Sequence, residues 1–154
     1  MALSVGDTAP GFTLPADSGE TLSLSDFKGK AVVLYFYPRD MTPGCTIEAN
    51  DFTALADKFR KINTIVVGVS KDSPERHDKF CDKHGLKIRL VSDQDGTLCD
   101  AYRIWKQKSL YGRTFMGIER TTFLIDKAGK IREIWRKVKV RGHAAEVLEK
   151  ATAL

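Results

Sequence analysis

A continuous run of apolar, β-branched and aromatic residues extends from Ala31 to Tyr37. A short run of this kind without polar alternation predicts a strand buried on both faces. Asn63–Ser70 is a second apolar run of the same type. The segment between them has apolar side chains at helical spacing: Ile47, Phe52, Leu55, Ala56 and Phe59. This order predicts a βαβ unit with parallel strands and a right-handed crossover.

A further helix, a third strand and a short helix are indicated after this unit. Ser73, followed by proline and an acidic residue, is typical of a helix start, and the helix should reach His84, where Gly85 stops it. Ile88–Val91 predicts a strand, and Gly96–Tyr102 predicts a short helix.

The last third of the chain predicts an antiparallel strand pair and a final helix. Thr121–Ile125 and Lys130–Val140 have the composition of strands, and Asp126–Gly129 between them is typical of a tight hairpin turn. The final helix should open at Gly142. Residues 103–117 mix aromatic, basic and glycine residues, which we interpret as a long loop with at most a short strand.

The first 30 residues predict a small hairpin followed by one helical turn. Phe12–Pro15 and Thr21–Leu24 alternate apolar and polar side chains on either side of the turn residues Asp17–Gly19. Ser25–Gly29 is expected to form a helical turn with Ser25 as its cap.

The length and composition are those of one compact unit. The 154 residues suit a single domain, residues 1–154, and the strand and helix order predicts an α/β fold with a mixed central β-sheet flanked by helices. The hydrophobic and charged fractions, 42% and 29%, are ordinary for a soluble globular protein. No apolar run approaches the roughly 20 residues that a membrane-spanning helix needs, so no membrane association is expected.

The cysteine content and the N-terminus indicate a reducing compartment. The chain opens without a basic start and an apolar core, and it has three cysteines. Cysteines in such a chain are more often reactive than structural. We therefore expect a cytoplasmic protein.

The net charge of +5 is distributed unevenly along the chain. Residues 127–141 contain seven basic side chains and one acidic one, which gives this segment +6 and leaves −1 for the remainder. A basic stripe can bind nucleic acid, but no nucleic-acid motif accompanies it. We interpret it as a solvated strand face and expect no nucleic-acid partner.

The chemistry of the chain is concentrated between the first predicted strand and the helix after it. Pro38 has no N–H group for a strand ladder, so it ends the strand. A proline–glycine turn follows, and it places Cys45 in the first turn of the helix. Helix N-termini carry unpaired N–H groups and a partial positive charge, and both favour a thiolate over a thiol.

The residues around Cys45 form a recognisable motif, Pro-x-x-x-Thr-x-x-Cys, with Pro38, Thr42 and Cys45 in its fixed positions. The longer stretch Tyr-Pro-Arg-Asp-Met-Thr-Pro-Gly-Cys-Thr, followed by Glu48, closely resembles the peroxiredoxin Q subfamily, also called bacterioferritin comigratory protein. The resemblance covers nearly the whole chain, from Gly6 to the last predicted helix. It implies a thioredoxin-like fold and a thiol-dependent peroxidase that serves antioxidant defence and redox homeostasis.

The resemblance also assigns roles to individual residues. Cys45 would be the peroxidatic nucleophile, which attacks hydrogen peroxide or an organic hydroperoxide and becomes a sulfenic acid. Thr42, the backbone amides at Gly44 and Cys45, and Arg120 would bind the peroxide oxygens, while Pro38 would shield the sulfur from water. Arg120 is carried over from the pattern Gly-Ile-Glu-Arg-Thr-Thr-Phe-Leu-Ile-Asp, since spacing alone does not single it out.

A second cysteine is expected to condense with the sulfenic acid. Many members of the subfamily have it five residues after the first, but this chain has Asn50 there. Cys81 and Cys99 remain. Loop-closure entropy does not choose between them, and we favour Cys81 because another branch of the subfamily resolves from that place. Cys99 is otherwise a small buried residue.

Thioredoxin is the expected reductant of the resulting disulfide, with glutaredoxin as the alternative. The resemblance implies a monomer and no cofactor. A thioredoxin-type reductase would need a Cys-x-x-Cys pair, which is absent at Cys45. Cys81 and His84 have metal-ligand spacing, but zinc normally requires four ligands, so we expect no metal. A binding module that uses the basic stripe is the remaining alternative.

Overall fold

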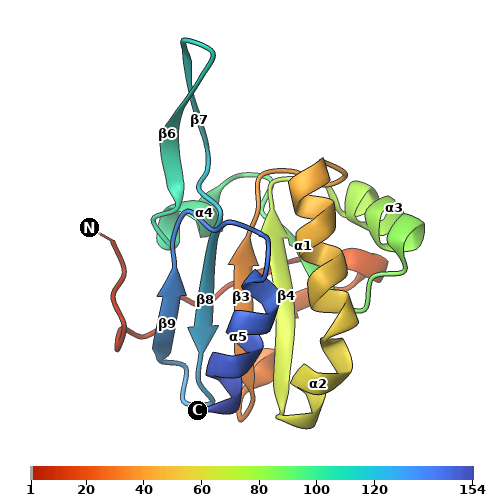
Figure 1. The fold of residues 1–154 in the computed structure, drawn as a ribbon, viewed down its shortest axis with the longest axis vertical. Helices are drawn as coiled ribbons and strands as arrows, with labels where there is room; N and C mark the ends of the chain where they lie inside the picture. The colour runs from red at the N-terminus through yellow and green to blue at the C-terminus, as the bar shows by residue number, and fades with distance from the viewer. Residues whose placement is uncertain (1) are drawn as a thin grey trace.

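The structure, a computed structural model, describes residues 2–154 and is built around a mixed five-stranded sheet (Figure 1). Its central strand pairs in parallel with one neighbour and antiparallel with the other. In spatial order the strands are β5 (Arg89–Ser92), β4 (Thr64–Ser70), β3 (Ala31–Phe36), β8 (Thr121–Ile125) and β9 (Ile131–Trp135). The predicted fold class and the parallel βαβ unit are both confirmed.

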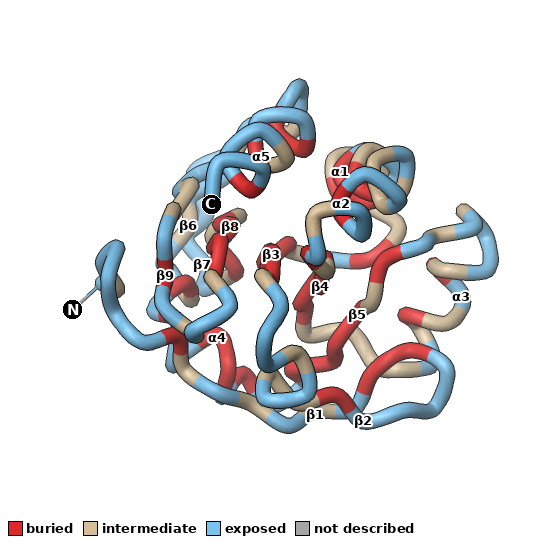
Figure 2. The backbone as a smooth tube through the Cα atoms, turned by 90° about the horizontal axis from the view of Figure 1, so that it is seen from below, coloured by how far each residue is buried: buried red, intermediate tan, exposed pale blue. Residues whose placement is uncertain are grey.

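Helices cover both faces of this sheet, and α3 (Pro74–His84) lies beside its β5 end (Figures 1 and 2). One face is covered by α1 (Pro43–Ala54), α2 (Ala56–Lys61) and α5 (His143–Thr152). The other face is covered by α4 (Thr97–Ala101) together with the N-terminal hairpin. Within residues 2–154 no helix has the length and apolarity needed to span a membrane.

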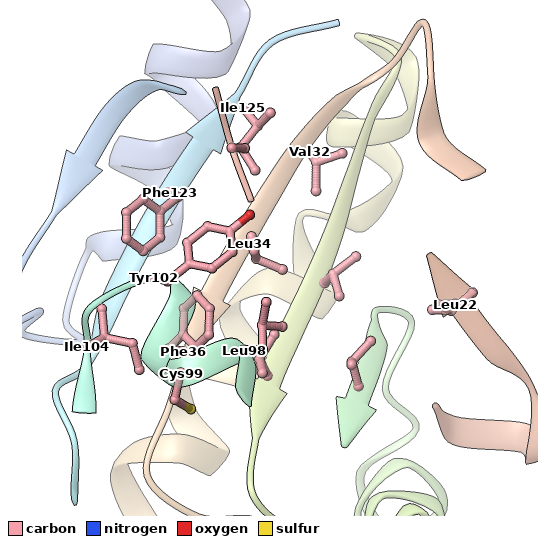
Figure 3. Packing of buried hydrophobic residues seen from close by; sticks show 14 of the residues in the cluster. Leu22, Val32, Leu34, Phe36, Leu98, Cys99, Tyr102, Ile104, Phe123 and Ile125 are labelled. Atoms are coloured by element: carbon pink, nitrogen blue, oxygen red, sulfur yellow. The ribbon is translucent and has the colours of Figure 1, made fainter. Parts of the chain in front are cut away.

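The central strand divides the core into two clusters, because successive side chains of a strand point to opposite faces. Phe36 and its alternate neighbours pack with α4 and the N-terminal segment, as Figure 3 shows around Cys99. Tyr35 and Tyr37 pack with α1, α3 and α5 on the opposite side. The continuous apolar run of the sequence is therefore explained by burial of both faces.

The N-terminal hairpin was predicted correctly, but the cap of the turn after it was not. The hairpin strands β1 (Thr13–Pro15) and β2 (Thr21–Ser23) are antiparallel around the short 3₁₀ helix η1 (Asp17–Gly19). The next helical turn, η2 (Leu24–Phe27), is capped by Ser23 and not by Ser25. The Ser23 amide bonds the carboxylate three residues ahead, which completes a capping box that the earlier start allows.

Two helix boundaries follow the sequence signals closely. Ser73 accepts a hydrogen bond from the backbone amide of Arg76 at the start of α3, and Gly85 ends that helix with φ of 59°. The antiparallel pair β8–β9 and the start of α5 after Gly142 are also as predicted. A single break at Leu55 divides α1 from α2.

The expectation of a long loop at residues 103–117 was wrong. This segment forms a hairpin of β6 (Trp105–Leu110) and β7 (Arg113–Ile118), which extends away from the body of the molecule (Figure 1). Tyr111 and Gly112 both have positive φ, as the tight turn between twisted strands requires. Most of the hairpin is exposed on both faces, so the sequence lacks the apolar–polar alternation that marks a strand packed on a core.

The predicted strand Lys130–Val140 is also too long. β9 ends at Trp135, and the following residues form a loop whose Val138 amide bonds the carbonyl of Arg120 at 2.9 Å. The alternating basic and apolar pattern of this loop imitates a strand. The backbone of the loop instead bonds the connection between β7 and β8, and its Arg136 side chain donates to the Leu3 carbonyl at 2.9 Å.

We predict that His143 makes the stability of the fold depend on pH. Burial lowers its pKa to about 4, and its Nε2 atom lies 2.8 Å from the Thr122 hydroxyl. In the unfolded chain His143 binds a proton near pH 6.5, whereas in the folded chain it stays neutral down to about pH 4. The free energy of unfolding should therefore decrease as the pH falls from about 6.5 to about 4.

Urea denaturation of the wild type and His143→Gln across this range tests the prediction. The difference between the two proteins should be constant above this window and change inside it. A difference that stays constant across the whole range would contradict the role given to His143.

Candidate active site

Cys45 lies in the first turn of α1, at the end of the sheet where β3 stops. Thr42 precedes the helix, and Pro43 occupies its first position, which needs no amide donor. The first amide bonded within the helix is that of Thr46, to the Thr42 carbonyl at 2.9 Å. The amides of Gly44 and Cys45 come before it, so they have no acceptor within the helix and can bind a ligand atom near the sulfur.

Arg120 lies against Cys45, although 75 residues separate them in the chain. Its Nη2 atom donates to the Cys45 Sγ atom at 3.3 Å, and its Nη1 atom donates to Glu48 Oε1 at 2.6 Å. The sulfur is almost completely buried, with 1% of Cys45 exposed. A guanidinium at this distance and depth stabilises negative charge on the sulfur with little screening by solvent.

Glu48 is a buried acid to which the sequence analysis gave no role. It follows Cys45 by three residues, so it lies on the same face of α1, and burial raises its pKa to about 7 against the opposing effect of Arg120. Its second oxygen, Oε2, is buried without a hydrogen-bond partner among residues 2–154. Sequence spacing alone could have placed Glu48 beside Cys45, but only the packing shows that it holds Arg120.

Gly44 allows the arginine to approach the helix. A Cβ atom at this position would lie 3.3 Å from the Arg120 Nη2 atom, which is closer than ordinary van der Waals contact. A larger residue would push the guanidinium away from the sulfur. The structure therefore adds a steric reason for glycine to the expected role of its amide.

Thr42 directly precedes the sulfur-bearing turn of α1, and Pro38 lies in the loop between β3 and that helix. The Thr42 hydroxyl donates to the Arg39 carbonyl at 2.9 Å, so its proton is engaged and its lone pairs remain to accept from a substrate O–H group. Pro38 is half-buried and lies two residues after the end of β3.

A lysine of the unpredicted hairpin adds positive charge to the same region. Burial lowers the pKa of Lys108, and the charge of Arg120 lowers it further. The Lys108 side chain lies across Gly117 of the facing strand, which has no side chain to displace it. Sequence reasoning missed this residue because the hairpin itself was missed.

The three cysteines are free thiols on two different sides of the sheet. Cys81, on α3, is half-buried and packs against the same core cluster as Cys45. Cys99, on α4, is fully buried in the opposite cluster (Figure 3). Burial, reinforced by nearby carboxylates, raises the pKa of the Cys81 thiol to about 12, and it also raises that of Cys99.

One group in residues 2–154 has several potential metal ligands close together, and it includes neither Cys81 nor His84. It consists of Asp40, Asp72 and His77, whose ligand atoms lie within 4.8 Å of one another. Each carboxylate and each ring nitrogen already has a hydrogen-bond partner within the protein. The group is better explained as a structural network than as a metal site.

The chain was compared with known proteins in three ways. The model of the AhpC/TSA family matches residues 5–134. Peroxiredoxin Bcp of Bacillus subtilis is 50% identical over 149 residues, which is 97% of this chain and 95% of that protein. A mutant of Xylella fastidiosa PrxQ has a TM-score of 0.94 at 44% identity over 99% of this chain and 98% of that one.

A Xanthomonas campestris peroxiredoxin Q has a TM-score of 0.88 at 46% identity, with 92% of this chain and 90% of that one covered. The family match spans most of the chain, and both the sequence relatives and the solved structures belong to the family that the motif around Cys45 indicates. The chain therefore belongs to the AhpC/TSA family and is a peroxiredoxin, a thiol-dependent peroxidase of the peroxiredoxin Q or Bcp type.

Proposed function

We propose that the Cys45 thiolate attacks the terminal oxygen of a hydroperoxide that binds beside Arg120 and Thr42. The S–O bond forms as the O–O bond breaks, and the leaving alkoxide or hydroxide takes up a proton. The products are a Cys45 sulfenic acid and an alcohol or water. The observation that carries this proposal is the 3.3 Å contact between Arg120 Nη2 and Cys45 Sγ at the start of α1.

The groups around the sulfur suit the charge that develops in this step. Negative charge passes from sulfur to the peroxide oxygens during the reaction. Arg120 and the amides of Gly44 and Cys45 can stabilise this charge at both places without changing their positions. Thr42 accepts from the peroxide O–H group and so orients the O–O bond. Pro38, at the end of β3, limits the access of water to the sulfur.

Both hydrogen peroxide and organic hydroperoxides are proposed as substrates. The bacterioferritin comigratory protein of Xanthomonas campestris, 44% identical to this chain, was solved as trapped intermediate and ligand complexes that address its alkyl peroxide reduction activity.

Cys81 is proposed as the resolving cysteine, which makes the enzyme an atypical 2-Cys peroxiredoxin. Its thiol would attack the Cys45 sulfenic acid, forming the S–S bond and releasing water. Cys81 shares a core cluster with Cys45, whereas the whole sheet separates Cys99 from both. This arrangement favours Cys81 for a physical reason that the sequence did not contain.

Resolution should require local unfolding of α1, α3 or both. The raised pKa of Cys81, about 12, leaves almost no thiolate in the folded state, and thiolate is the attacking species. A disulfide also needs Cα atoms about 4.4–6.8 Å apart. Opening of the helices would expose Cys81, restore its nucleophilicity and let the two sulfurs meet.

Thioredoxin is the proposed reductant, with glutaredoxin as the alternative, and the enzyme is proposed to act as a monomer. In this scheme both thiols of the cycle belong to one chain, so no second copy is needed to complete it. A dithiol reductant would attack the exposed disulfide and return both cysteines to thiols.

Cys45→Ser should reduce peroxide consumption to background, because the hydroxyl of serine is not an adequate nucleophile towards the O–O bond. The assay follows hydrogen peroxide with thioredoxin, its reductase and NADPH. Unchanged circular dichroism would show that the variant is folded. Full activity in this variant would overturn the proposed mechanism.

Arg120→Ala should slow the reaction with peroxide by roughly 10²- to 10³-fold, the usual cost of losing one donor to a developing oxyanion. The ultraviolet absorbance of the thiolate at neutral pH should also decrease. Arg132→Ala, which alters an exposed arginine of β9, is the matched control. Equal rates in the two variants would exclude the proposed role.

Cys81→Ser should preserve the first turnover but abolish thioredoxin-linked cycling, whereas Cys99→Ser should cycle normally. Peptide mapping after peroxide treatment should find a Cys45–Cys81 bridge. A Cys45–Cys99 bridge, or one between two copies of Cys45, would contradict the assignment.

A further inference from the structure

A buried pair of side chains joins the loop before α1 to α3. The Asp40 carboxylate and the His77 ring are both 0% exposed, and His77 Nδ1 lies 2.6 Å from Asp40 Oδ2. His77 Nε2 lies 3.0 Å from the Val91 carbonyl, which can only accept, so this nitrogen carries a proton. Tyr37 donates to the other Asp40 oxygen.

The backbone of Asp40 is held by the segment that starts α3. Its amide donates to Asp72 Oδ2 at 2.8 Å, and its carbonyl accepts from Arg76 Nη2 at 3.2 Å. Arg76 in turn donates to Asp72 Oδ1 at 2.9 Å. Apart from the Tyr37 contact, each of these bonds to Asp40 comes from residues 72–77.

The residue after Asp40 has a conformation that needs such support. Met41 has φ of 65°, in the left-handed region that a non-glycine residue seldom adopts. Local strain of this kind persists where surrounding contacts enforce it. When the Asp40 contacts are lost, the strained backbone at Met41 should relax to a more common conformation.

The pair lies close in sequence to both thiols of the proposed cycle. Asp40 is five residues before Cys45, and His77 is four residues before Cys81, one helical turn away on the same face of α3. Figure 1 shows α1 and α3 on neighbouring parts of the molecule. The two segments that take part in the proposed resolution are therefore joined by a group of hydrogen bonds centred on Asp40, of which the His77 contact is fully buried.

We propose that the Asp40–His77 pair, supported by Arg76, is a latch between the loop before α1 and α3. The latch keeps both segments in the folded conformation and so sets the rate of disulfide formation. This inference rests on the proposed resolution by Cys81. His77 is a positioning residue: it does not touch the reacting atoms but determines how often the two sulfurs become free to meet.

The latch has a chemical consequence because the sulfenic acid has two fates. In the opened conformation it condenses with Cys81 and releases water. In the closed conformation it remains beside Arg120 and Thr42, where a second hydroperoxide oxidises it to sulfinic acid and leaves as the alcohol or water. A tighter latch gives more sulfinic acid at a given peroxide concentration, and a looser latch gives less.

The first test uses the reduced protein without peroxide. His77→Gln removes the ring that contacts both Asp40 and the Val91 carbonyl, and it should raise hydrogen exchange in residues 40–46 and 74–81 by roughly 100-fold, the effect of breaking a buried pair. The amides of β3 and β8 should keep their protection. His84→Gln, the same substitution near the end of α3, should change exchange by less than about twofold.

The second test measures the fate of Cys45 by mass spectrometry. After a single equivalent of hydrogen peroxide, His77→Gln should form the disulfide about tenfold faster than wild type and His84→Gln. The peroxide concentration that over-oxidises half of the protein should rise by a similar factor.

Arg76→Ala provides a milder variant should His77→Gln fail to fold. It removes the hydrogen bond from Arg76 to the Asp40 carbonyl but leaves the Asp40–His77 pair. The rates of hydrogen exchange and of disulfide formation should therefore both rise by about threefold. A change of exchange spread equally over the sheet would indicate a merely structural role and overturn the latch. Unchanged resolution in both folded variants would overturn it as well.

Failure of the latch can be distinguished from failure of the proposed cycle. If wild type forms no Cys45–Cys81 bridge, the cycle is wrong, whatever the exchange data show. If that bridge forms but its rate is the same in His77→Gln, Arg76→Ala and His84→Gln, the cycle stands and the latch is wrong.

Discussion

The pairing of β3 with a strand on each side is the constraint on which the site depends. The antiparallel register with β8 aligns Phe36 with Thr121, so the end of one strand lies beside the start of the other. Arg120 directly precedes that start, and the turn to α1 directly follows the end of β3. The guanidinium therefore meets the helix N-terminus because of strand register, without a long loop to carry it.

Much of this arrangement could be predicted, for identifiable reasons. The burial of Ala31–Phe36 on two faces and the start of α1 are encoded locally, in composition and in turn residues. Arg120 came only from the family resemblance, because its contact with Cys45 depends on a register that no local pattern records. The hairpin carrying Lys108 was missed because it packs on no core. The contact of Glu48 with Arg120 was missed because it depends on tertiary packing, which no local pattern in the sequence records.

One guanidinium serves two acids in this site. Arg120 bonds both Glu48 and the Cys45 sulfur, and burial raises the pKa of Glu48 to about 7 against the opposing effect of this guanidinium. The positive charge of Arg120 is therefore shared between two side chains of α1.

The division of the core by the sheet means that the reactivities of Cys81 and Cys99 report two different opening reactions of the fold. Alkylation of Cys81 reports the opening of one helix, since it lies near the surface on α3. Cys99 is enclosed between the sheet and α4, so a reagent reaches it only when that whole layer comes apart. The alkylation rates of Cys81 and Cys99 with one thiol reagent should therefore report the free energies of a partial opening and of a global opening of the same chain.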